Sequence, residues 1–140
     1  MNRMGHARLV GVMHVDLETV RLFLHVLAAC VWVGGQIVLA ALVPALRAAG
    51  SDVPKAAANA FNRVAWPAFG VLVLTGVWNV AAEDDLDQGT LGVKYALVLI
   101  SGVSAFIHGR ATSRRQMAIW GAATGLSAVA TLFVGIVLAG

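Results

Sequence analysis

Two ionisable residues, His25 and Lys94, lie within or beside long apolar segments of this 140-residue chain. Neutral imidazole is the commonest metal ligand among side chains and also holds haem iron. A deprotonated lysine can act as a second ligand of the metal, and a charged lysine can pair with a carboxylate. Ionisable residues inside membrane spans are functional candidates. We therefore expect a metal or haem site on this pair; a hydrogen-bonded packing histidine and an interface lysine are the simpler alternatives.

Several other polar or aromatic residues fall on the faces of the predicted helices that carry the pair. Trp32 follows His25 by seven residues and would form the wall of a flat cofactor, although packing alone also explains it. Gln36 shares that face, and Ser101 shares the face of Lys94. Arg63 would pair with a carboxylate in the interior of the bundle or with lipid headgroups.

His108 is a separate candidate, because it lies fourteen residues after Lys94, or about 21 Å along a helix. His25 and His108 are therefore expected near opposite membrane faces, which disfavours one haem held between them. In a copper-handling alternative the ligands would be His25 and His108, with a tail that contains further soft and borderline ligands: Met4, His6, Met13 and His14.

Four apolar runs carry these residues: Leu22 to Leu46, Val64 to Ala82, Tyr95 to Gly109, and Gln116 to Gly140. A bilayer core needs roughly 20 apolar residues to be crossed as a helix, and the short third run reaches that length if its terminal basic side chains extend to the headgroups. The sequence predicts an all-α, four-helix transmembrane bundle with helices at about 19–48, 55–82, 91–111 and 115–139.

Composition supports a single membrane domain over residues 19–140, preceded by a polar tail at 1–18 for which Met13 is an alternative start. The chain is 59% hydrophobic and 12% charged, against roughly 25% charged in soluble domains. Its net charge of +3 is small and lies at the span ends, so nucleic acid is not an expected partner. Cys30 is the single cysteine, which excludes an internal disulfide.

Polar residues at helical spacing predict which face of each span points inward. The expected faces are His25, Ala29, Trp32, Gln36 and Val43 on the first span; Asn59, Arg63, Pro67, Gly70 and Leu74 on the second; Lys94, Ser101, Ala105 and His108 on the third; and Trp120, Thr124, Ser127 and Thr131 on the fourth.

A stripe of small residues on the fourth span indicates either packing within the bundle or a homodimer seam: Gly121, Gly125, Ala128, Gly135 and Ala139.

The distribution of basic residues predicts the orientation. The first and third connections carry arginine and lysine, whereas the second is acidic. We expect the protein to lie in the inner membrane of the cell. The positive-inside rule then places both termini on the side away from the cytoplasm. The spans contain no Asp or Glu, which argues against a carboxylate proton relay, and the chain has no HExxH motif or phosphate-binding loop.

Several segments resemble the copper-resistance D (CopD) domain family from about Val20 to the C-terminus. They are residues 24–35 (LHVLAACVWVGG), 61–67 (FNRVAWP), 74–79 (LTGVWN) and Val93-Lys94. Full-length members of that family are larger and are linked to copper uptake across the inner membrane. The chain looks like their four-helix core.

A more distant resemblance is to the HemJ-type protoporphyrinogen oxidases. The histidine in their first helix and the lysine in their third, which matter for haem binding, would correspond to His25 and Lys94. Their Leu-Pro-Arg-Leu stretch is replaced here by Leu42-Val43-Pro44-Ala45-Leu46-Arg47. The resemblance implies haem b and a possible oxidoreductase activity.

The expected function is binding of haem b for electron transfer with a redox partner, or for haem handling. His25 is the expected axial ligand, and Lys94 the second ligand or propionate partner. Haem-free copper handling and a purely structural membrane subunit are the alternatives.

Overall fold

The computed structural model describes residues 16–83 and 86–139, and they form long helices. The helices are α1 (Leu17–Ala29), the π-helical turn η1 (Cys30–Gly34), α2 (Gly35–Ala49), α3 (Val53–Ala82), α4 (Gln88–Arg110) and α5 (Arg114–Ala139). The first three are continuous, so the chain has four rods, each long and apolar enough to cross a membrane. The predicted all-α, four-helix transmembrane bundle is confirmed.

The predicted helix bounds agree with the structure to within a few residues. α1 begins at Leu17, two residues earlier than expected, and so includes two residues assigned to the tail. The third helix begins at Gln88, earlier than expected. The tail candidates Met4, His6, Met13 and His14 lie outside the described residues.

Side chains at the helix ends explain where the rods begin. Asp16 accepts a hydrogen bond from the Thr19 backbone N–H at 2.8 Å, and Asp87 accepts one from the Thr90 N–H at 2.7 Å. Both are N-caps that satisfy a free amide of the first turn. Between α2 and α3, Gly50 has a φ of 156°, a conformation that side-chain-bearing residues rarely adopt.

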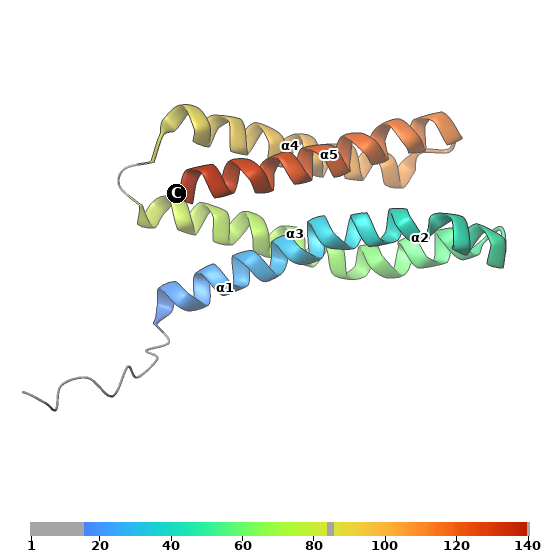
Figure 1. Cartoon of the computed structure of the whole chain (residues 1–140), viewed down its shortest axis with the longest axis horizontal. Helices are drawn as coiled ribbons and strands as arrows, with labels where there is room; N and C mark the ends of the chain where they lie inside the picture. Colours follow the sequence, from blue (N-terminus) through green and yellow to red (C-terminus); the bar gives the residue numbers. More distant parts are fainter. Residues whose placement is uncertain (1–15, 84–85, 140) are drawn as a thin grey trace, which may run out of the picture.

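The rods are arranged as two antiparallel pairs (Figure 1). In one pair α3 runs along α1 and α2, and in the other α5 runs along α4. The π-helical turn η1 packs against both α3 and α5, so it is where the two pairs make close backbone contact.

The buried core lies at the level of η1. It consists of Trp32, Val33, Ala65 and Ala128, with Phe61, Phe69, Leu72 and Ala105 packed against it. All four rods contribute to this cluster. Many large apolar side chains elsewhere are exposed, including Leu74 and Leu126 at 72% each, which gives the bundle the apolar surface that lipid requires.

Burial confirms most of the predicted inward faces, but the face predicted for α3 is wrong. Arg63 and Leu74 on that face are exposed, whereas Ala65 and Thr75 are buried. The prediction followed polar residues near the start of α3, where a polar side chain can be solvated and so does not report the interior. The inward face, which includes Phe61, Ala65, Leu72 and Thr75, lies about half a turn round the helix from the predicted one.

Candidate functional site

His25 is half-buried between α1 and α3, and its hydrogen bond fixes the state of the ring. Its Nδ1 lies 2.8 Å from the Thr75 hydroxyl oxygen. That hydroxyl donates its own hydrogen to the Val71 carbonyl at 2.7 Å. Because a hydroxyl has one hydrogen, Thr75 accepts from His25, so Nδ1 carries the proton. In the neutral ring Nε2 then has a free lone pair, which is the form of imidazole that can bind a metal.

The imidazole ring lies against a glycine of α3. A Cβ on Gly76 would lie 3.5 Å from the Cε1 of His25, which is ordinary contact. The ring is thus bonded to the Thr75 hydroxyl and lies beside the neighbouring Gly76 of α3. An axial histidine of a metal centre is oriented in the same way, through a hydrogen bond from its other ring nitrogen.

Lys94 approaches from the other helix pair. It is half-buried on α4, and its Nζ lies beside Gly135 of α5, 3.5 Å from where a Cβ would be. His25 contacts α3 near its C-terminal end, whereas Lys94 and Gly135 belong to the start of α4 and the last turns of α5, which lie at that same end of the bundle (Figure 1). The structure therefore brings His25 and Lys94 to the same region of the bundle, as their expected depths predict.

Trp32 and Ser101 form a packed, hydrogen-bonded connection in the core. Trp32 is 3% exposed, and its indole N–H donates to the Ser101 hydroxyl at 3.0 Å. Ser101 in turn donates to the Thr124 carbonyl of α5 at 3.3 Å. The Trp32 ring also packs on Phe69, at 4.4 Å between ring centroids, and edge-on against Trp66 at 5.6 Å. This connection ties η1 to α4 and α5.

Gln36 and Arg63 lie apart from the His25 region. Gln36 is half-buried on α2, and its Nε2 has no hydrogen-bond partner among the described residues. Arg63 is exposed on α3, twelve residues before Thr75, which is about 18 Å along the helix. The structure does not bring Arg63 to the imidazole.

His108 is at the opposite end of the bundle from His25. It is exposed near the α4–α5 turn, where its Nδ1 donates to the Met117 carbonyl at 2.9 Å. His25, in contrast, contacts the part of α3 that leads to its end at Ala82. The two histidines are not brought together. Within residues 16–83 and 86–139, no group of three or more His, Cys, Asp or Glu side chains is placed to hold a metal ion.

The small-residue stripe of α5 is partly occupied by the bundle itself. Ala128 belongs to the core, Gly121 contacts the His108 ring, and Gly135 contacts Lys94. These contacts support the packing interpretation of the stripe. The homodimer seam stays a prediction.

Sequence analysis missed three polar residues of the site region, namely Arg21, Thr75 and Asn79. Arg21 precedes His25 by four residues and so lies on the same face of α1; it is 5% exposed. Thr75 and Asn79 have the same spacing on α3, and the Asn79 Oδ1 is buried without a described partner. The four-residue spacing of each pair was the signal that could have identified these residues. For Thr75 and Asn79 it was overlooked because the inward face of α3 was predicted on the wrong side of the helix.

No protein-family model, curated protein or solved structure matches this chain.

Proposed function

We propose that this chain binds haem b between its two helix pairs, with the Nε2 of His25 as an axial ligand, for electron transfer or haem handling in the inner membrane. The observation that carries the proposal is the chain of hydrogen bonds from His25 to Thr75 to the Val71 carbonyl. It presents an oriented, neutral imidazole with its second nitrogen free, which is the form that coordinates metals.

A porphyrin suits this region better than a copper ion held by protein alone. Haem supplies four nitrogen ligands itself and requires only axial side chains, whereas a copper site draws several ligands from the chain. Lys94 lies at the same end of the bundle as His25, and His108 lies at the other end. Haem-free copper handling would thus have to recruit ligands from elsewhere.

The arrangement of the two pairs also favours a planar ligand near His25. Close backbone contact between the pairs is made mainly by η1, while α1 packs on α3. Among the described residues, α1, which carries His25, makes no extensive backbone contact with α4 or α5. Side chains can adjust around a ligand at a smaller cost than helices.

Each residue has a distinct task in the proposed site. Bound haem would supply the electron-transfer chemistry. Thr75 holds the imidazole in one tautomer and one orientation. Lys94 serves as a cation for a propionate carboxylate, or as the second ligand in its deprotonated form.

The absorption spectrum of purified protein, as isolated and after addition of hemin, tests the proposal. We expect a Soret band that His25→Ala removes and His108→Ala leaves intact, because His108 bonds to the α4–α5 turn. A band that survives His25→Ala would contradict the assignment of the ligand.

Two further results would each favour an alternative function. Protein that gains no Soret band with hemin but binds copper in metal analysis would support copper handling. Protein that binds neither, and folds equally well after both substitutions, would support a structural subunit.

A further inference from the structure

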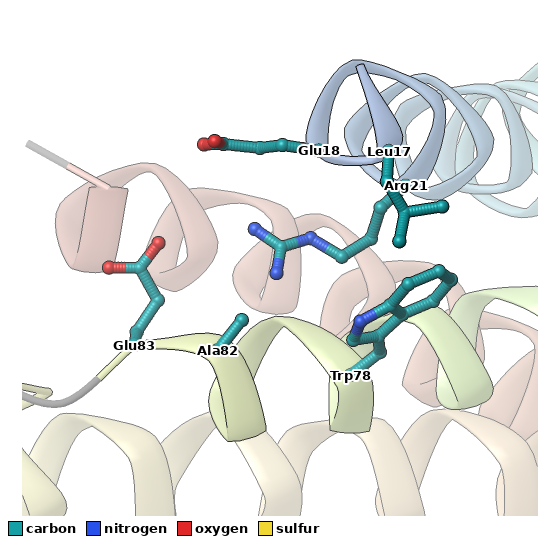
Figure 2. Close-up of a pocket in the computed structure, with 6 residues that line it drawn as sticks. All are labelled: Leu17, Glu18, Arg21, Trp78, Ala82 and Glu83. Carbon is teal, nitrogen blue, oxygen red and sulfur yellow. The ribbon is translucent and has the colours of Figure 1, made fainter.

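A cavity of about 170 Å³ lies between the start of α1 and the end of α3, separate from His25. Figure 2 shows its lining, which is Leu17, Glu18 and Arg21 from α1 with Trp78, Ala82 and Glu83 from the α3 end. An engineered protein cavity of about 150 Å³ holds a benzene-sized molecule. The cavity therefore suits a small polar headgroup.

Arg21 is the residue that indicates a ligand. It is 5% exposed, and its Nε has no hydrogen-bond partner among the described residues. Figure 2 shows the guanidinium extending from α1 into the space between Glu18 on one side and Ala82 and Glu83 on the other. A buried N–H of a charged group without a partner is costly, so a group that accepts a hydrogen bond from the Arg21 Nε would relieve that cost.

The charges around the cavity exclude a simple anion. Two carboxylates, Glu18 and Glu83, flank the single guanidinium of Arg21. A phosphate or carboxylate alone would gain a bidentate contact with Arg21 but would meet repulsion from both acids. A zwitterion satisfies both, since its anion can pair with the guanidinium while its ammonium lies between the carboxylates.

The surroundings of the cavity indicate a membrane lipid as the source of this zwitterion. Leu17 is 67% exposed and Trp78 is 42% exposed, and both lie at the ends of membrane-spanning helices. Tryptophan is enriched at that level of a bilayer, where its ring meets headgroups. Acyl chains attached to a headgroup in the cavity would continue along the apolar outer surface of the bundle.

We propose that this cavity binds the headgroup of a zwitterionic phospholipid that carries a primary ammonium. The phosphate contacts Arg21, and the ammonium donates to Glu18 and Glu83. Free phosphoethanolamine carries the same polar groups but has no acyl chains. The proposal is independent of the haem site.

Native mass spectrometry of the haem-free protein, with lipids added singly, tests this site. We expect phosphatidylethanolamine to be retained roughly tenfold better than phosphatidylcholine or phosphatidylglycerol, the scale of one charged hydrogen bond. Phosphatidylcholine cannot donate hydrogen bonds from its headgroup, and phosphatidylglycerol has no ammonium. Free phosphoethanolamine should not displace the lipid; if it competes at equal concentration, the ligand is a soluble zwitterion and the lipid proposal is wrong.

Variants distinguish the roles of the two charges. Arg21→Gln should reduce retention of phosphatidylethanolamine about tenfold, and the exposed Arg63→Gln is the matched control with no expected change. Glu18→Gln combined with Glu83→Gln alters exposed residues and should not impair folding. It should reverse the preference toward phosphatidylglycerol, because the repulsion is removed while Arg21 remains. An unchanged preference in this double variant, or full retention in Arg21→Gln, would overturn the proposal.

Discussion

At the residue scale, Thr75 controls the proposed axial ligand without touching the iron. Thr75→Ala removes the acceptor for the His25 Nδ1–H, so the imidazole loses its fixed orientation. Loss of such a supporting hydrogen bond typically lowers metal affinity 10–100-fold. We expect hemin affinity, measured by titration of the Soret band, to fall in that range, roughly 10–100-fold.

Thr75→Ser is the matched control for this prediction. Serine keeps the hydroxyl that accepts from His25 and donates to the α3 backbone. Hemin affinity should therefore stay near that of the wild type. If alanine and serine variants bind equally well, Thr75 does not orient the ligand.

The hydrogen bond between Trp32 and Ser101 gives a second prediction at this scale. Ser101→Ala leaves the buried indole N–H without an acceptor. Hydrogen bonds between membrane helices average about 0.6 kcal/mol and reach about 1.7 kcal/mol in double-mutant cycles. We expect Ser101→Ala to lower the free energy of unfolding by about 1 kcal/mol, measured by steric trapping in bicelles.

A double-mutant cycle with Trp32→Phe isolates that contribution. Phenylalanine retains the aromatic packing on Phe69 but has no N–H to satisfy. Adding Ser101→Ala to Trp32→Phe should then cost less than it does in the wild type. Strictly additive losses would show that the hydrogen bond contributes nothing to stability.

At the element scale, two glycines of α4 differ in what surrounds them. A Cβ on Gly102 would lie 2.8 Å from the Phe69 ring of α3, whereas nothing lies within 4 Å of one on Gly109. Gly102→Ala should force the two helix pairs apart and cost about 1–3 kcal/mol, as overpacking does. Gly109→Ala should be neutral or stabilising by up to about 1 kcal/mol, because alanine favours a helix.

Thermal unfolding of the two alanine variants in the same detergent measures this difference. The expected shifts in Tm have opposite signs or differ clearly in size. Equal shifts would mean that the Phe69 ring moves aside at no cost. The contact between α3 and α4 would then not be a constraint on the bundle.

The start of α4 responds to acid through its N-cap. Hydrogen bonds from the Thr90 side chain and then its backbone N–H hold the pKa of Asp87 below its usual value. This stabilisation is fully present above about pH 3.9, the ordinary Asp pKa, and is lost as pH falls through the lowered value. Tm measured between pH 2 and 6 should thus decline at the acidic end, beyond any loss in Asp87→Asn.

Asparagine is the appropriate control here because it caps helices well without titrating. The difference in Tm between wild type and Asp87→Asn isolates this one carboxylate, since Asp16 and the other acids are common to both proteins. A difference that does not vary with pH would contradict the assignment of the cap.

The faces and turns of the individual helices could be predicted from the sequence only in part. Helical spacing correctly indicated that His25, Trp32 and Gln36 face inward, because apolar neighbours on the other faces set the phase of the first span. On α3 almost every position is apolar, so Asn59 and Arg63 near its start determined the predicted phase and misplaced it. The π-helical turn at Cys30–Gly34 ends beside Gly35, against which the Phe61 ring packs, and this contact between distant segments is contained in no local pattern.

At the scale of the whole molecule, the two helix pairs pack closely at the level of η1, and buried polar side chains gather on one side of that level. Near η1 the core cluster and the Trp32 connection join all four rods. Toward the end of α3, polar residues accumulate instead: Arg21, His25, Thr75, Asn79 and Lys94. The packed level thus adjoins the half of the bundle that holds these buried and half-buried polar side chains, where both proposed ligands would bind.

The side of the membrane that this polar half faces is the final prediction. The end of α3, the start of α4 and the end of α5 lie at one end of the bundle, and the basic connections lie at the other (Figure 1). Because basic connections are retained in the cytoplasm, we expect the polar half and both termini to face outward. A C-terminal alkaline phosphatase fusion should be active and a C-terminal green fluorescent protein fusion dark. The reverse result would place His25 near the cytoplasmic leaflet, and a haem there would exchange electrons with cytoplasmic partners.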